Sequence, residues 1–249
     1  MGLFVAFVDI MRVTLRQLLG RRRTLLLILL ATLPVLLAIA FRVAGVTDVD
    51  RFTRRVFDTI TMIILLPLVA ILFGSGAFGA EIDEGTVVYL LAKPVPRWIV
   101  VAAKALSAVA IAILLTGASA AVAGIIDMVP AGSDGVSATL AQVVAMVVGS
   151  ACYVSLFLAL SLFTRRALVI GIGYMLVWEG ALSSLLAGIA NLSIRQYALG
   201  AATAIYKLPN QETRLSAETS FILAVVLVVV ALVVATWKLM RFELPGGGD

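Results

Sequence analysis

Acidic residues at two places in this chain have types and spacings that suit specific chemistry. The stretch from Glu81 to Arg97, EIDEGTVVYLLAKPVPR, combines three acids, a Gly-Thr pair, a short apolar run and a Lys-Pro-Val-Pro-Arg sequence. Acids ahead of a short helix suit the positive end of its dipole, and Thr86 or Gly85 is suited to begin that helix. The second place is Glu179, which stands inside a long apolar run.

Glu179 needs a partner or a special environment wherever its apolar run crosses a membrane. A carboxylate near the bilayer centre costs about 2.5–3.5 kcal/mol on insertion scales, so it must face the bundle interior, pair, or be protonated. Arg195 is the next basic residue along the chain. Two interpretations stay open: Glu179 lines or gates a substrate path with Trp178 and Arg195, or it hydrogen-bonds to Ser or Thr groups and holds its helix in place.

The composition predicts an all-α, multi-pass membrane protein of the cell membrane. The chain is 62% hydrophobic and 13% charged, whereas soluble domains are about half apolar and about a quarter charged. Several apolar runs approach or exceed the roughly 18–20 residues that span a bilayer as a helix. The chain contains no histidine, which excludes a His-based metal site or general base, and no metal site is expected. The net charge of +5 is interpreted as membrane topology rather than nucleic-acid binding, because the arginines flank apolar runs.

One transmembrane domain is predicted over residues 1–249. Residues 3–19 form an amphipathic helix that lies in the membrane interface, with Arg12 and Arg16 opposite its apolar face. Trp98 marks the interface before the third span, and Lys104 is expected to reach that interface by snorkelling. Six transmembrane helices are predicted at 24–41, 57–80, 105–126, 138–163, 167–190 and 221–240.

The second predicted span and the last long loop carry further expectations. Pro67 is expected to kink the span, and Gly74, Gly76 and Gly79 to let a neighbouring helix approach closely. Asp58 is predicted to be solvated near an interface. Residues 191–220 are an external segment that either re-enters the membrane or lies flat on its surface.

Six spans place both termini on one side of the membrane. Most of the 19 basic residues fall on that side, so the termini are predicted to be cytoplasmic. The Glu81–Arg97 stretch, between spans 2 and 3, is then cytoplasmic as well. A short amphipathic helix there can dock on a soluble partner, or it can simply cap the two spans; the residues alone leave both open.

The Glu81–Arg97 stretch resembles the cytoplasmic signature of type-2 exporter permeases of the ATP-binding-cassette (ABC) transporters, the ABC-2 family. The resemblance is carried by an acidic cluster, Gly-Thr, a leucine pair and Pro-Val-x-Arg, at Glu81, Glu84, Gly85, Thr86, Leu90, Leu91, Pro94, Val95 and Arg97. Trp178-Glu179-Gly180, followed by 192–197, LSIRQY, is similar to the branch that includes the permease of the nitrous-oxide-reductase maturation transporter.

The resemblance implies a permease that works as a pair, most simply a homodimer in membrane lipid, with two separate ATP-binding subunits. The coupling helix that docks on those subunits is expected to include Glu81, Asp83, Glu84, Gly85, Thr86, Tyr89, Leu90 and Leu91. This chain has no G-x-x-x-x-G-K-[ST] phosphate loop, so ATP and Mg would be held by the partner subunit and this chain would be no enzyme. Alternatives are a membrane subunit that acts mechanically on another protein, or an ATP-independent secondary transporter or channel.

Overall fold

The elements of this chain were placed with a computed structural model. It describes residues 2–20, 22–45, 53–83, 95–127, 132–164, 166–182, 192–208 and 213–241. Within those ranges all the regular secondary structure is helical, as the composition predicted. The helices, in chain order, are α1 (Leu3–Leu19), α2 (Arg22–Val43), η1 (Thr53–Leu65), α4 (Leu66–Asp83), α6 (Arg97–Asp127), α7 (Ser133–Phe163), α8 (Ala167–Gly173), η3 (Tyr174–Leu182), α10 (Ile194–Ala202) and α11 (Ala217–Met240).

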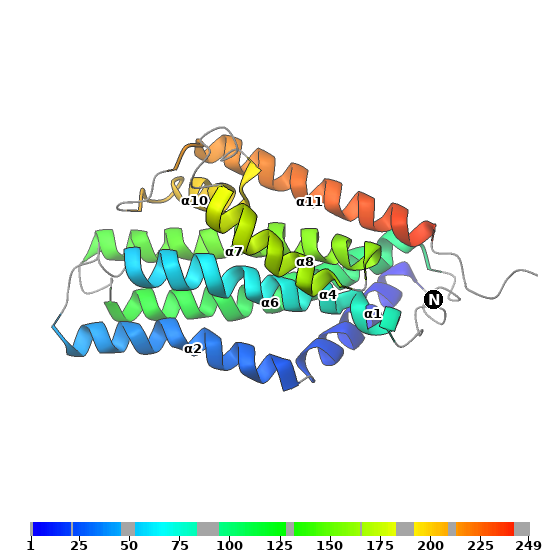
Figure 1. Ribbon diagram of the computed structural model, residues 1–249, viewed down its shortest axis with the longest axis horizontal. Helices are drawn as coiled ribbons and strands as arrows, with labels where there is room; N and C mark the ends of the chain where they lie inside the picture. Colours follow the sequence, from blue (N-terminus) through cyan, green and yellow to red (C-terminus); the bar gives the residue numbers. More distant parts are fainter. Residues whose placement is uncertain are drawn as a thin grey trace, which may run out of the picture.

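Helices α4, α6 and α7 form the centre of the bundle, and α2 and α11 lie at its periphery (Figure 1). Much less of α2 and α11 is buried inside the bundle than of the three central helices. Their outer faces are rows of exposed leucine, isoleucine and valine side chains. Such faces suit contact with lipid or with another membrane helix, because exposed apolar surface on this scale is costly in water.

Five described helices are long and apolar enough to cross a membrane: Thr24–Val43, Val56–Gly79, Arg97–Ile126, Ser133–Phe163 and Ala217–Met240. They correspond to five of the six predicted spans. The third and fourth extend beyond their predicted starts, because helical structure continues into flanking residues that are more polar. The remaining predicted span, the fifth at 167–190, is represented by the shorter apolar helix Ala167–Glu179 within α8 and η3. Residues 183–190 of that prediction lie outside the described residues.

Helix α1 has the bounds that its sequence pattern predicts. Thr14 and Leu18 are buried, while Arg12 and Arg16 are exposed. The helix packs on α6 and α4, and the Ser107 hydroxyl of α6 donates to the Met11 carbonyl at 3.3 Å. Part of the apolar face of α1 therefore covers other helices of the same chain, while Phe4, Val8 and Leu19 are exposed. Its position in the membrane interface remains a prediction.

The second long apolar helix changes its winding next to Pro67. Segment η1 is π-helical, and α4 continues from Leu66 with α-helical winding. In η1 the Thr61 hydroxyl donates to the carbonyl of Val56, five residues earlier. Proline has no backbone N–H and so makes no hydrogen bond to the preceding turn. A change of winding at Pro67 therefore breaks no hydrogen bond that this residue would donate.

Gly74 allows α4 to lie close to α7, as predicted. A Cβ at position 74 would stand 2.8 Å from the carbonyl oxygen of Val154 and 3.1 Å from Cβ of Phe157. Only a residue without a side chain permits this approach of the two backbones. Gly79, on the same helix, has open space at the equivalent position.

Candidate functional site

The predicted docking segment, which is the Glu81–Arg97 stretch, is described only at its two ends. Helix α4 ends at Asp83 and α6 begins at Arg97. Glu81 is described on the last turns of α4. The side chain of Asp83 and all of Glu84, Gly85, Thr86, Tyr89, Leu90 and Leu91 lie outside the described residues, so their docking role stays a prediction. The two helices next to the segment, however, make specific contacts with each other.

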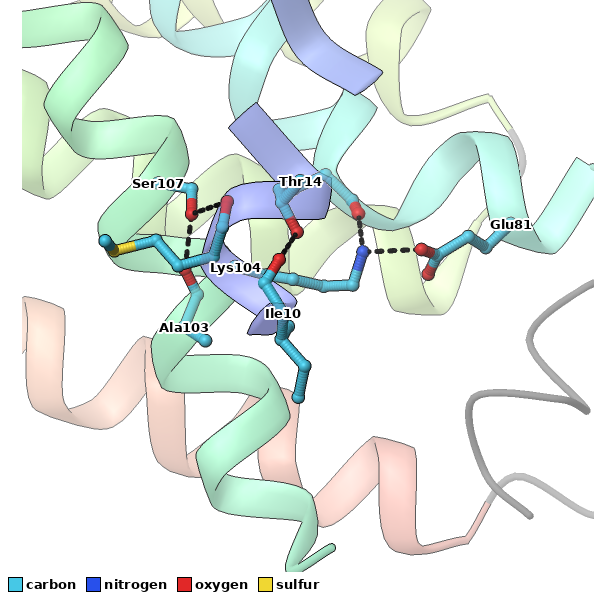
Figure 2. Close-up of polar contacts among 8 residues, drawn as sticks. Ile10, Thr14, Glu81, Ala103, Lys104 and Ser107 are labelled. Atoms are coloured by element: carbon cyan, nitrogen blue, oxygen red, sulfur yellow. Dashed lines mark hydrogen bonds and ion pairs between the residues drawn. The ribbon is translucent and has the colours of Figure 1, made fainter. Parts of the chain in front are cut away.

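Glu81 pairs with Lys104 between α4 and α6 (Figure 2). Nζ of Lys104 donates to Oε1 of Glu81 at 2.8 Å and to the carbonyl oxygen of Ala77 at 2.7 Å. It also lies 4.9 Å from the centroid of the Phe78 ring. Ala77 and Glu81 are four residues apart, so both acceptors stand on one face of α4 and a single ammonium group reaches them.

Lys104 does not snorkel to the interface, contrary to the sequence-based expectation. Its side chain is 1% exposed and that of Glu81 is 13% exposed. The reason is that acceptors from α4 meet the ammonium group inside the bundle, which removes the need to reach water. Buried polar atoms without a hydrogen-bond partner include Oε2 of Glu81 and Nη1 of Arg97 among the described residues.

Glu179 lies in η3 and is 6% exposed. Its Oε2 accepts a hydrogen bond from the Ser193 hydroxyl at 2.6 Å, and its Oε1 accepts one from the backbone N–H of Ile194 at 2.9 Å. The Tyr174 hydroxyl donates to Oε1 at 3.4 Å, and the buried phenol of Tyr153 in α7 also interacts with the carboxylate. Hydrogen bonding to serine, one of the two open interpretations, is therefore what the structure contains.

The carboxylate of Glu179 stands at the N-terminus of α10. Ser193 is the N-cap of that helix and accepts from the N–H of Gln196, while Glu179 satisfies the N–H of Ile194. A negative charge is stabilised at the positive end of a helix dipole, where N–H groups lack partners in the helix. Glu179 thus fastens α10, which is buried against α7 and α11, to η3.

Arg195 pairs with Asp58 of η1. Arg195 was predicted to act beside Glu179, and Asp58 was predicted to be solvated. Asp58 is instead ion-paired and only partly exposed. The two side chains are about a quarter exposed, and Nε of Arg195 is buried without a hydrogen-bond partner among the described residues. A residue 137 positions away in sequence supplies the counterion, which no local spacing indicates.

Trp178, next to Glu179 in η3, contacts the same region. Its ring stacks on that of Tyr174 with centroids 6.3 Å apart, and its Nε1 donates to the Leu192 carbonyl at 3.4 Å. The contacts of Trp178 and Glu179 with 192–194 therefore bring both side chains to the start of α10, which contains Arg195. We call this group, with Asp58, Tyr153, Tyr174 and Ser193, the α10 cluster.

Sequence reasoning missed several members of the two sites. Tyr153 and Tyr174 stood in predicted spans as ordinary aromatic residues. Ser193 could have been found as an N-cap, because it precedes an amphipathic stretch. No group of three or more metal-binding side chains occurs among the residues that the structure describes. Within the α10 cluster, the carboxylate of Glu179 accepts hydrogen bonds that join α10 to η3.

Replacing Asp58 with asparagine should destabilise the attachment of α10 to η1. The guanidinium of Arg195 would lose its charged partner, and coupled pairs show interaction energies of about 0.5–3 kcal/mol. We expect Asp58→Asn and Arg195→Gln to lower the thermal unfolding temperature in detergent, and the double variant to be less destabilised than the sum. Arg42→Gln, at the exposed end of α2, is the control. Fully additive losses would contradict the pairing.

Comparison with known proteins agrees with this architecture. A scan against protein families matches residues 6–244 to the ABC-2 family transporter proteins. A search among curated proteins found no match. The family match spans nearly all of the chain, from α1 to the residues that follow α11. This chain belongs to the ABC-2 family of transporter proteins.

Proposed function

We propose that this chain is the membrane-spanning permease subunit of an ABC exporter, and that it couples ATP hydrolysis by a separate subunit to movement of a substrate. The observation that carries the proposal is the family match over residues 6–244. Members of this family are generally membrane subunits without catalytic activity of their own and associate with ABC ATP-binding subunits. The five long apolar helices agree with a multi-pass protein of the cell membrane.

The proposed topology has six crossings, with α8 and η3 as the fifth. Figure 1 shows the start of α1 and the end of α11 at the same end of the bundle. Termini on one side require an even number of crossings, so the five long helices need one more. The basic residues around these termini support a cytoplasmic location for that end. The ends of the docking segment, at α4 and α6, lie near α1 and would then also be cytoplasmic.

ATP and Mg are proposed to bind to the partner subunits and not to this chain. The sequence lacks the phosphate loop that would hold them. Two ATP-binding subunits would dock on two copies of the permease, one docking segment for each. The exposed apolar faces of α2 and α11 support a second permease copy and lipid as neighbours in the membrane.

The α10 cluster supports the branch that resembles the nitrous-oxide-reductase maturation permease. The two sequence motifs behind that resemblance, around Glu179 and around Ser193, are joined by hydrogen bonds between these residues. A shared structural connection is a reason for the two motifs to occur together. We therefore propose that this chain belongs to this branch, and that the α10 cluster holds α10 at the outer end of the substrate path.

Docking is tested by replacing predicted contact residues within the docking segment. Glu84→Ala combined with Leu90→Ala should abolish copurification of the ATP-binding subunit with the tagged chain, because one charge and one apolar contact are removed together. Val136→Ala, at an exposed position near the start of α7 at the other end of the bundle, should leave copurification unchanged. Full retention of the ATP-binding subunit by the double variant would rule out docking through this segment.

A further inference from the structure

The Lys104–Glu81 pair joins the two helices that carry the docking segment. Glu81 is two residues from the end of α4, and Lys104 is seven residues from the start of α6. Any displacement of residues 84–96 acts first on these two helix ends. The contacts across this place decide whether α4 and α6 respond together or separately.

The contacts made by Lys104 are directional, whereas most of its surroundings are apolar. Buried neighbours along α6, such as Ala103, Ala105 and Ala108, contribute hydrophobic contact, which has no preferred direction. The ammonium group is instead bound to two fixed acceptors of α4, the Ala77 carbonyl and the Glu81 carboxylate. Replacing buried ionic groups with apolar groups often costs no stability, so such groups are weak evidence for a stabilising role. Their best-attested use is to fix the register of the elements that they join.

Helix α1 also contacts α4 and α6 near the Lys104–Glu81 pair. Ser107, one turn beyond Lys104, donates to the carbonyls of Ala103 and Met11, so α1 lies along α6 beside the ion pair (Figure 2). Leu18 of α1 approaches Gly76 of α4. Three helices therefore meet at the ends of the docking segment, and Lys104 provides the polar bonds between α4 and α6.

We propose that the Lys104–Glu81 pair fixes the register of α4 and α6, so that movement of the docking segment displaces both helices as one unit. The inference rests on the proposed function. Lys104 and Glu81 are positioning residues in it: they are needed to pass on the movement and are not needed for the ATP-binding subunit to dock. Glu81 thereby acts through Lys104 and not through direct contact with the partner.

The test separates register from stability by removing one partner or both. In Lys104→Met a buried carboxylate loses its counterion, and this variant should unfold at a lower temperature than the unmodified chain. In Glu81→Leu combined with Lys104→Met both charges are gone, so the unfolding temperature should recover. If the pair only stabilises the fold, the double variant should recover both its unfolding temperature and the joint movement of α4 and α6. A register-fixing pair predicts that stability recovers and joint movement does not.

Joint movement is measured between spin labels on α4 and α6 in the complex with the ATP-binding subunit. Labels at Leu72 and at the exposed Leu114 are placed in a Cys152→Ala background, and their distance is compared without nucleotide and after trapping with ATP and vanadate. With Lys104 and Glu81 unchanged, the distance between the two labels should be the same in both states. The double variant should keep the ATP-binding subunit and give a shifted distance after trapping.

Three results would overturn the proposal in different ways. An unchanged distance in the double variant shows that the pair does not fix the register, and leaves the proposed function intact. A distance that shifts in the unmodified chain shows that α4 and α6 are not one unit. Failure of any ATP-binding subunit to copurify with the unmodified chain removes the proposed function, and this inference with it.

Discussion

Replacing Glu179 with alanine should release α10 from η3 and cause one of the two largest losses of stability in this protein. The Ser193 hydroxyl and the Ile194 N–H both donate to this carboxylate and are buried. Each buried donor left without an acceptor costs about 1–3 kcal/mol. The alanine variant should therefore unfold at a clearly lower temperature in detergent and expose the backbone of 192–202 to faster hydrogen exchange.

Glu179→Gln is the matched variant, because its amide oxygen can still accept from Ile194. We expect it to fold and to keep α10 protected from exchange. Loss of transport in this variant would assign Glu179 to the substrate path in addition to its structural contacts. Full transport by Glu179→Gln would limit the residue to holding α10. An alanine variant as stable and as protected as the unmodified chain would contradict the attachment itself.

Replacing Gly74 with alanine should separate α4 from α7, at a cost of about 1–3 kcal/mol, as overpacking of a core does. The new Cβ would meet the Val154 carbonyl at 2.8 Å, and a backbone atom cannot move aside as a flexible side chain can. The expected result is a lower thermal unfolding temperature and a lower yield of folded protein.

Gly79→Ala gives the opposite expectation on the same helix. Its Cβ would enter open space, and alanine favours a helix by about 0.8–1 kcal/mol over glycine. This variant should be as stable as the unmodified chain or more so. The two glycines stand five residues apart on one helix, so equal losses of stability at both positions would contradict close packing against α7 as the cause of the loss at Gly74.

Apolar periodicity was sufficient to predict most of the helices, and it failed where backbone geometry departs from regular winding. The bounds of α1 follow from its alternation of apolar and polar faces. The fifth expected span was harder, because 167–182 divides into α8 and the π-helical η3, and apolar composition does not distinguish π from α winding. A close helix approach was predicted for Gly74, Gly76 and Gly79 alike. The sequence did not distinguish Gly74, which lies against α7, from Gly79, which has open space beside it.

Partners distant in the sequence could not be predicted for Lys104, Asp58 and Glu179. Lys104 meets Glu81 only because α4 and α6 adopt one particular register, and the connecting segment does not specify that register by its length. Arg195 meets Asp58 through the packing of α10 against the rest of the bundle. The need of Glu179 for a partner was evident from the cost of a buried charge, but the identity of that partner depended on the tertiary structure.

Affinity capture of the tagged chain from its native membrane is the measurement that tests the central claim most directly. Mass spectrometry of the purified complex should identify an ATP-binding subunit that carries a phosphate loop, and ATP hydrolysis should copurify with the chain. Both should be lost together in the Glu84→Ala, Leu90→Ala variant. Capture of the chain without any such subunit, combined with solute flux that needs no ATP in vesicles of the purified chain, would contradict an ATP-driven permease.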